Sequence, residues 1–468
     1  MKFKHMAACA LISAALAGPA AAQAPAGEAA FRELYEQLVE IDTSQASGSC
    51  TRAAEAMAAR LRGGGLPEGD VRVITPPDRP DDGNLVAVLR GTNRRAGALL
   101  LLAHIDVVDA RRADWERDPF TLIEENGFFY ARGSADDKAM AAIFVDLFIR
   151  MRAEGYRPRR DIRLALTCGE ETSNRVNGVE YLLANHRDWI QAEFALNEGA
   201  GGILTPEGRP IALNIQAGEK IHQVYTLTVT NPGGHSSRPV PDNAIYHLSA
   251  GLGRLAAHNF PVELTEATRL FFERMAPIVG GEMGLAMAAL ARNPADSAAA
   301  ATLARDASFN AMMRTTCVAT QLEAGHAPNA LPQRAQATLS CRVLQGHTPE
   351  EVQAALQAVM NDPRIGVEIV RRRSGSAAPP LTRAIMGPIE RIAARMWPGV
   401  PVVPVMTAGA TDGRHLNNAG IATYGVSGLF SVPGENNAHG LNERIRVQSV
   451  MEGRAFLDAL VRAYAAGR

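Results

Sequence analysis

The chain has 468 residues, of which 47% are hydrophobic, and its 48 basic and 49 acidic residues nearly cancel. This length and apolar content are enough for one large core or two smaller ones. The balanced charge argues against a strongly basic nucleic-acid-binding protein and against an acidic disordered tail, so we expect no nucleic-acid partner.

Residues 1–22 are predicted to form a secretory signal peptide. Lys2 and Lys4 give a positive start, residues 7–17 are apolar, and three alanines end the segment in a small-residue cleavage pattern. The apolar stretch is too short for a stable membrane anchor. Cys9 lacks the preceding small residues that a lipoprotein signal needs. We therefore expect a soluble periplasmic or secreted protein with no membrane anchor, which folds from residue 23 onward.

Three short apolar runs, at 98–103, 162–166 and 194–196, are predicted to be buried parallel strands. Helix-like stretches at 139–151 and 179–184 lie between them. Alternating strands and helices predict an α/β fold with a mostly parallel sheet. In such sheets ligands bind beyond the carboxyl ends of the strands.

The pattern changes near residue 216. The stretch HQVYTLTVT at 222–230 alternates apolar residues with threonines, which is typical of a half-exposed antiparallel strand. We interpret 216–372 as a smaller inserted α+β lid domain that includes an Ala- and Met-rich, helix-like segment at 263–313. The other elements expected in it are helices at 244–257 and 350–360 and a strand at 367–370.

The catalytic domain is then expected in two parts, 23–215 and 373–468. Strands near 402–405 and 422–426 are expected to return the chain to the parallel sheet. The lid domain between these parts would also serve dimerisation.

The four cysteines beyond the signal are too sparse for a disulfide-dependent fold, so the hydrophobic core must carry the stability. Two of them fall on the predicted strands CVATQLEAG and QATLSC, which turn around 327–332. A symmetric hairpin places Cys317 opposite Cys341. A disulfide and two unpaired buried thiols are both compatible with this pairing.

Acidic and histidine side chains follow the predicted parallel strands. His104 and Asp106 follow the first strand, Glu170 and Glu171 follow the second, and Glu198 follows the third. Each signal alone is more typical of a surface loop. Together they place several carboxylates at one sheet edge, where they would repel one another and bind protons.

Two further loops add to this set. Asp136 and Asp137 lie in a Gly/Ser turn before a helix, and His439 lies in the late segment NNAHGLNER. Two imidazoles and several carboxylates at one edge need a compensating cation, and two divalent metal ions would supply it.

With these motifs the chain resembles the zinc-dependent aminoacylase/carboxypeptidase G family of co-catalytic metallopeptidases, over nearly all of its length beyond the signal. It is most similar to the carboxypeptidase S-like branch in DWERDPF, GEETSNRVNG, RTTCVATQLEAGHAPNALP and GATDGRHL. The resemblance implies a zinc-peptidase-like catalytic domain with a ferredoxin-like lid. It also implies two Zn²⁺ per chain, for which Co²⁺ or Mn²⁺ could substitute.

The resemblance also implies a ligand set. His104 and Glu198 would bind one zinc ion, His439 and Glu171 would bind the second, and Asp136 would bridge the two.

Glu170 would be the general base, which takes a proton from water and gives it to the leaving amine. Asp106 would hold the imidazole of His104 in one tautomer. The peptide bond between Asp136 and Asp137 is often cis in the family.

His235 in NPGGHSSRP would stabilise the oxyanion of the tetrahedral intermediate. In relatives the matching histidine often comes from the other subunit of a dimer, so a homodimer is possible, and action within one chain stays open here.

Arg342 would bind the substrate carboxylate through its guanidinium fork, with Asn329 as its neighbour. Arg414 is a candidate for a second carboxylate contact. Ser340 and Cys341 replace the acid that commonly precedes the arginine, which limits any transfer of substrate preference. The residues that would shape the pocket floor are Gly409, Thr411 and Asp412.

The expected function is hydrolysis of an amide or peptide bond next to a free carboxylate. The enzyme would be a metallocarboxypeptidase or an N-acyl-amino-acid amidohydrolase, acting on a small peptide or an N-acyl amino acid. One alternative is a dizinc aminopeptidase or dipeptidase, against which the GGHSSRP loop and the insertion argue. A further alternative is a non-catalytic relative that binds peptides or metal, whose signature would be a lost ligand or a replaced Glu170.

Overall fold

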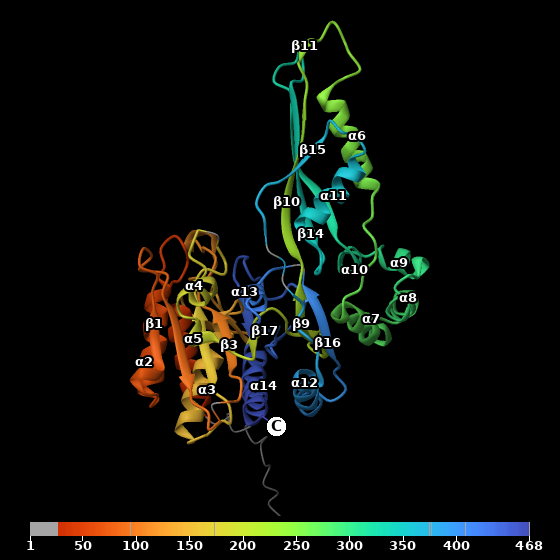
Figure 1. Ribbon diagram of the computed structural model, residues 1–468. Helices are drawn as coiled ribbons and strands as arrows, with labels where there is room; N and C mark the ends of the chain where they lie inside the picture. Colours follow the sequence, from red (N-terminus) through yellow and green to blue (C-terminus); the bar gives the residue numbers. More distant parts are fainter. Residues whose placement is uncertain are drawn as a thin grey trace, which may run out of the picture.

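The computed structural model describes residues 27–93, 95–172, 174–373, 375, 377–407 and 409–467. The predicted signal peptide at 1–22 lies outside these residues. Figure 1 shows a larger domain built around a wide sheet and a smaller, elongated domain that projects from it. Within the described ranges, every helix is too short or too polar to cross a membrane.

The large sheet has ten strands in the described part of the chain, in the order β1-β2-β6-β3-β7-β17-β9-β8-β18, with β16 paired to β9. At its centre β3 (Leu99–His104) runs parallel to β6 (Ile162–Thr167) and to β7 (Phe194–Asn197). This confirms the α/β fold with a mostly parallel sheet. The other strands are β1 (Val71–Ile74), β2 (Asn84–Leu89), β8 (Gly202–Leu204), β9 (Pro210–Glu219), β16 (Val402–Thr407), β17 (Ala422–Gly425) and β18 (Phe430–Ser431).

Helices cover both faces of this sheet. The leucine run of β3 is therefore buried on both sides. Leu99 and Leu101 pack into the main core, while Leu100 and Leu102 pack on the opposite face. The helices of the main core are α1 (Glu28–Glu40), α2 (Cys50–Gly63), α3 (Lys138–Ala153), α12 (Arg383–Met396) and α14 (Val447–Ala466). Those on the opposite face are α4 (Gly178–Asn185), α5 (Arg187–Ile190) and α13 (Gly413–Asn418).

The small domain contains a separate antiparallel sheet in the order β12-β14-β10-β15. The alternation predicted for its first strand is confirmed, because Tyr225, Leu227 and Val229 are buried against two helices. Cys317 pairs with Cys341 in the register and the two form a disulfide, so they are not free thiols. The elements are β10 (Ile221–Thr230), α6 (Ala244–Ala257), β12 (Thr316–Ala324), β14 (Arg334–Val343), α11 (Pro349–Met360) and β15 (Gly366–Ile369).

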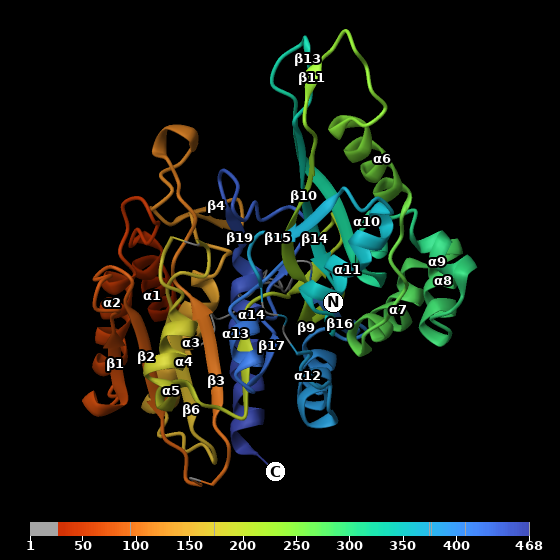
Figure 2. The ribbon, with the colours of Figure 1, turned by 45° about the horizontal axis from the view of Figure 1, so that its top comes forward.

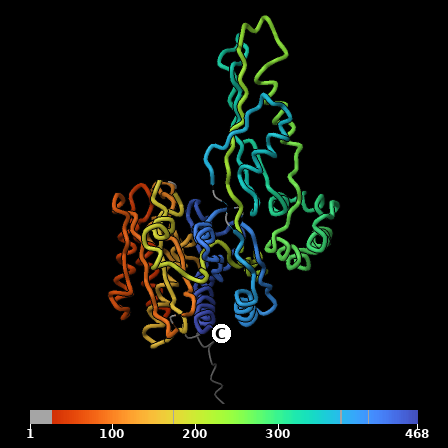
Figure 3. Tube along the Cα trace, viewed as in Figure 1, coloured from red at the N-terminus to blue at the C-terminus, as the bar shows by residue number. Residues whose placement is uncertain are grey.

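The chain crosses from the large sheet to the small one between Glu219, the last residue of β9, and Ile221, the first of β10. The domain bounds at 23–215, 216–372 and 373–468 stay predictions. Figure 3 shows the chain running out along the projecting domain and returning to the larger one.

The segment at 263–313 is helical, as predicted. Phe272 and Met287 of these helices share a hydrophobic cluster with Val403 and Val405 of β16. The segment therefore packs against the edge of the large sheet, beside β16 in Figure 2. Its helices are α7 (Glu266–Val279), α8 (Gly281–Arg292), α9 (Ser297–Leu303) and α10 (Ala307–Met313).

The far end of the small domain carries a two-stranded ribbon, β11 (Gly234–His235) and β13 (Ala330–Leu331). Figures 1 and 2 both place this ribbon at the tip that is farthest from the large sheet. We refer to it as the lid tip.

Candidate metal and substrate site

The predicted polar residues lie at the carboxyl ends of the central parallel strands. His104 is the last residue of β3, Glu170 and Glu171 follow β6, and Glu198 follows β7. Parallel strands end at the same edge, so these side chains converge there. The loop before α3 brings Asp136 to the same edge.

Asp136 lies between two imidazoles. Its Oδ1 is 3.1 Å from Nε2 of His104, and its Oδ2 is 3.1 Å from Nε2 of His439. Nε2 of His439 is also 2.9 Å from Oε2 of Glu171. One ligand atom each from His104, Asp136 and Glu171 lie within 4.8 Å of one another, which makes them a candidate metal site.

Glu198 lies beside this group. It lines a small pocket together with Asp136. Burial would lower the pKa of His104, but the hydrogen bond and charge of Asp136, and then the charge of Glu198, raise it. The structure thus brings all five predicted ligand residues to one place.

The cluster has the electrostatics of a cation site. Burial raises the pKa of both Glu170 and Glu198 well above the usual range; the charge of His104 opposes this shift, and the neighbouring carboxylates add to it. Burial would also raise the pKa of Asp136, but hydrogen bonds with His104 and His439 outweigh it and lower that pKa. Imidazole nitrogens and carboxylate oxygens suit a divalent transition metal, so the residues present fit such an ion.

Asp106 orients both halves of the cluster. Nδ1 of His104 donates to the backbone carbonyl of Asp106 at 3.0 Å, while the carboxylate is 3.7 Å away. With Nδ1 engaged in this way, Nε2 is the ring nitrogen that faces Asp136 and that would bind a metal ion. The Asp106 carboxylate instead accepts the backbone N–H groups of Glu170 and Glu171 at 3.3 and 3.1 Å. The predicted tautomer control therefore runs mainly through the backbone oxygen.

The loop of Asp136 is held by Glu443, which the sequence analysis missed. This buried carboxylate forms a 2.7 Å ion pair with Arg132. The signal was present in the sequence, because Glu443 lies four residues after His439 and Arg132 lies four residues before Asp136. The peptide bond between Asp136 and Asp137 is cis, as the resemblance implies. The carboxylate of Glu443 also accepts the backbone N–H groups of Gly133, Ala135 and Asp136 at 2.8–3.0 Å.

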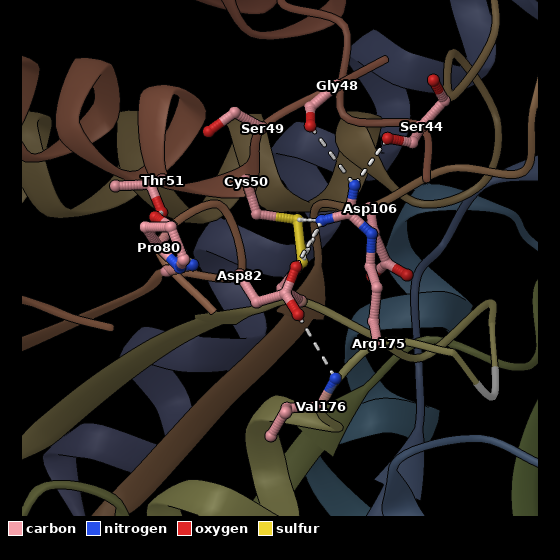
Figure 4. Close-up of polar contacts among 12 residues, drawn as sticks. Ser44, Gly48, Ser49, Cys50, Thr51, Pro80, Asp82, Asp106, Arg175 and Val176 are labelled. Carbon is pink, nitrogen blue, oxygen red and sulfur yellow. Dashed lines mark hydrogen bonds and ion pairs between the residues drawn. A yellow bond between two sulfur atoms is a disulfide. The ribbon is translucent and has the colours of Figure 1, made fainter. Parts of the chain in front are cut away.

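A second disulfide, Cys50–Cys168, lies directly beside the site and was not predicted. Cys168 is two residues before Glu170. Arg175 packs over the sulfur atoms, with Nη1 3.1 Å from Sγ of Cys168 and 2.9 Å from Oδ1 of Asp82 (Figure 4). The bridge and the guanidinium together tie the Glu170–Glu171 turn to the start of α2. Nη2 of Arg175 adds hydrogen bonds to the backbone carbonyls of Ser44 and Gly48.

Two of the predicted substrate residues lie in the cleft between the domains. Arg342 and Arg414 line it together with Glu170, Glu171 and His439, and its volume is about 420 Å³. The cleft therefore joins the metal cluster to the guanidinium groups of Arg342 and Arg414, among others.

The three residues predicted to shape the pocket floor, Gly409, Thr411 and Asp412, lie in different surroundings. Thr411 is buried, and its N–H and hydroxyl lie 2.7 and 3.1 Å from the carboxylate oxygens of Glu219. Ala410 lines the cleft, and Gly409 is exposed beside it. Asp412 accepts hydrogen bonds from Thr167 and Asn177, behind the cluster.

His235 and Asn329 lie together at the lid tip. The backbone N–H of Ser236 donates to the carbonyl of Asn329 at 3.1 Å. Nδ1 of His235 lies 2.7 Å from Oγ of Ser237, and the imidazole is exposed. A single chain does not bring these two residues to the metal cluster, because the lid tip is remote from the large sheet (Figure 1).

The chain is similar to known hydrolases along most of its length. It is 28% identical over 375 residues to the N-fatty-acyl-amino acid synthase/hydrolase PM20D1 of Xenopus tropicalis, covering 77% of this chain and 71% of that protein. It is 27% identical over 381 residues to the probable carboxypeptidase S-like 2 of Dictyostelium discoideum, covering 78% and 71%.

Its fold is similar to that of the M20 family metallo-carboxypeptidase Sso-CP2 from Sulfolobus solfataricus. The TM-score is 0.64 at 20% identity, over 93% of this chain and 99% of the other. The sequence profile of Peptidase family M20/M25/M40 matches residues 100–463, which include every residue of the candidate metal site. The chain therefore belongs to Peptidase family M20/M25/M40 and is an M20-type metallohydrolase.

Proposed function

We propose that the protein is a two-zinc hydrolase that cleaves an amide or peptide bond next to a free carboxylate. It would act as a metallocarboxypeptidase or as an N-acyl-amino-acid amidohydrolase. The observation that carries this proposal is the position of Asp136, with one carboxylate oxygen 3.1 Å from each of two imidazoles. Such a carboxylate suits a bridge between two metal ions.

The metal ions would be held by His104 and Glu198 on one side and by Glu171 and His439 on the other, with Asp136 between them. When bound, they would supply an activated water molecule and polarise the scissile carbonyl. Nitrogen and oxygen donors favour zinc, and Co²⁺ or Mn²⁺ would be accepted in its place.

Glu170 would move the proton. It lines the cleft, and the carboxylate of Asp106 holds its backbone N–H at 3.3 Å. Since Asp106 fixes the turn, the carboxylate of Glu170 is held ready to take a proton from water and to return it to the leaving amine. Arg342 would hold the free carboxylate of the substrate, with two parallel hydrogen bonds.

A second subunit would complete the site. Because His235 and Asn329 lie at the remote lid tip of their own chain, we propose that the lid tip of a partner subunit reaches the cleft in a homodimer. There the imidazole of His235 would donate a hydrogen bond to the oxyanion.

We also propose that the protein works outside the cytoplasm, in the periplasm or as a secreted protein. Two disulfides in the described residues are typical of an oxidising compartment and agree with the predicted signal peptide.

The test is a substrate panel with the purified protein, carried out together with elemental analysis. We expect about two zinc ions per chain and hydrolysis of N-acyl amino acids or of peptides with a free C-terminus. The matched control is each substrate with its carboxylate amidated, which should react poorly. Bound zinc without turnover of any substrate would contradict the proposal and favour a binding protein. Preference for the amidated substrates would favour an aminopeptidase.

A further inference from the structure

A single residue joins the two sheets where the chain first crosses between the domains. Glu219 ends β9 of the large sheet, Ile221 begins β10 of the small sheet, and Lys220 lies between them. The crossing is still paired to the large sheet, because the backbone N–H of Lys220 donates to the carbonyl of Thr407 in β16 at 3.0 Å. We refer to Glu219 and Lys220 as the hinge pair. Both residues are buried, with exposed fractions of 4% and 3%.

The two side chains of the hinge pair bind to different parts of the molecule, since successive side chains of an extended segment point to opposite sides. The carboxylate oxygens of Glu219 accept hydrogen bonds from the backbone N–H and the hydroxyl of Thr411 at 2.7 and 3.1 Å. Nζ of Lys220 donates to the backbone carbonyl of Arg314, just before β12. One side chain therefore attaches the crossing to the large domain, and the other attaches it to the small domain.

On the large-domain side, the contact of Glu219 reaches the metal cluster. Oγ1 of Thr411 also accepts a hydrogen bond from Nδ2 of Asn197 at 3.3 Å, and Asn197 directly precedes Glu198. Glu198 and Glu219 line one small cavity together with Thr411. The carboxylate of Glu219 is thus two hydrogen bonds away from the residue that precedes a predicted metal ligand.

On the small-domain side, the hinge pair is tied to the position of Arg342. In the register of the small sheet, Arg342 of β14 pairs with His222 of β10, which is two residues after Lys220. It pairs on its other side with Thr316 of β12, which is two residues after Arg314. Backbone pairing on both sides fixes Arg342 relative to the hinge pair. A shift of the hinge pair therefore moves Arg342 with it.

We propose that Glu219 is a positioning residue that sets the distance between Arg342 and the metal cluster. A substrate held at both points must span this distance, and a misplacement of about 1 Å can cost about 10²-fold in rate. A substrate without a free carboxylate is held at the metal cluster and does not sense the distance. This inference rests on the proposed function and adds a residue that acts through other residues.

The test compares the best free-acid substrate of the panel with the same compound in which the carboxylate is amidated, on the zinc-loaded enzyme. In the Glu219→Gln variant we expect kcat/KM for the free acid to fall by about 10- to 100-fold. The value for the amide and the zinc content should stay unchanged. An equal fall for both compounds would show a general structural role and overturns the inference. An unchanged value for the free acid overturns it as well.

Glu207→Gln is the matched control. Glu207 lies in the turn before the same strand, β9, but it is exposed. The variant removes the same charge and should keep both values of kcat/KM. A selective fall for the free acid in Glu207→Gln would mean that net charge attracts the substrate, and it would overturn the assignment of Glu219.

Lys220→Met tests the other member of the hinge pair. It removes the hydrogen bond to the carbonyl of Arg314 and should also lower kcat/KM for the free acid selectively. An unchanged value for the free acid in this variant would contradict the link between the hinge pair and Arg342.

A distance measurement gives a readout that does not need turnover. The four cysteines of the described residues are paired in disulfides, so Asp78→Cys and Glu368→Cys, at exposed positions of the large and the small domain, can be spin-labelled selectively. Adding Glu219→Gln should shift or broaden the distribution of distances between the two labels. An unchanged distribution contradicts the inference. Failure of the unaltered enzyme to prefer the free acid contradicts the proposed function, and the distance distribution then decides the role of Glu219.

Discussion

The edge of the large sheet and the lid tip hold their histidines in opposite ways. At the sheet edge His104 is only 2% exposed, and its Nδ1 is fixed by a backbone carbonyl. At the lid tip His235 is exposed, and its Nδ1 contacts only the next turn of its own loop, where it accepts a hydrogen bond from the backbone N–H of Ser237 and lies 2.7 Å from the hydroxyl of the same residue.

This difference indicates which part of the site one chain can build alone. Carboxyl ends of buried parallel strands converge, so the metal cluster is assembled within a single chain. The end of an antiparallel hairpin is solvated and meets nothing of its own domain core. In the proposed mechanism His235 therefore needs the surface of a second subunit, whereas His104 does not.

Metal binding at the sheet edge is expected to depend most strongly on Asp136. In the Asp136→Ala variant we expect loss of bound zinc and a fall in activity of at least about 10⁴-fold, because the carboxylate that lies 3.1 Å from each of the two imidazoles is removed. Elemental analysis and the substrate assay measure this together. Asp78→Ala, at an exposed aspartate, is the control and should match the unaltered protein. Two tightly held zinc ions in Asp136→Ala would disprove the bridge.

The Glu170→Gln variant separates metal binding from proton transfer at the sheet edge. The amide keeps the size of the side chain but cannot accept the proton, so we expect a fall in kcat of about 10²- to 10⁴-fold. Zinc content and melting temperature should stay near those of the unaltered protein. Activity that survives this change would show that another group is the base.

The contrast between the two regions also explains how far the sequence could predict the molecule. Apolar runs such as 98–103 and the alternation at 222–230 depend on local periodicity, and both gave the correct strands. Polar residues directly after those strands were therefore placed at the correct edge. The facing of Cys317 and Cys341 followed from the symmetry of a short hairpin.

What the sequence could not predict depends on contacts between distant segments. Cys50 and Cys168 are 118 residues apart, and no periodicity relates α2 to the turn after β6. Glu443 meets the loop of Asp136 from more than 300 residues away. The sequence also could not predict that the segment 263–313 packs against β16 instead of the small sheet. A helical pattern shows which face is buried but not which surface covers it.

The His235→Ala variant tests the role proposed for the lid tip. Loss of an oxyanion donor should lower kcat by about 10²- to 10³-fold, with zinc content unchanged. This effect is expected to be smaller than that of a change within the metal cluster.

Mixed dimers then show which chain the histidine serves. Co-expressed Glu170→Gln and His235→Ala subunits should regain about a quarter of the unaltered activity, since half of the dimers are mixed and each has one intact site. Neither variant alone should reach this value. No recovery in purified mixed dimers would mean that His235 acts within its own chain.

The two disulfides give the smallest effect and the most direct comparison of the two regions, because one lies beside the metal cluster and the other lies within the small sheet. The loops that they close span 118 and 24 residues, so chain entropy predicts contributions of about 5 and about 3 kcal/mol to the free energy of unfolding. Denaturant titration of Cys50→Ser/Cys168→Ser and of Cys317→Ser/Cys341→Ser measures both.

Activity should distinguish the two pairs more clearly than stability does. Cys168 is two residues from Glu170, so loss of its bridge should loosen the catalytic turn and lower kcat by about 10-fold at temperatures where the variant is folded. The Cys317→Ser/Cys341→Ser variant is the comparison. Its bridge joins β12 to β14 and lies next to Arg342, which would bind the substrate and not move the proton, so we expect a change in KM with kcat kept. Equal losses of kcat in both variants would show that the bridge beside the site contributes global stability and does not position Glu170.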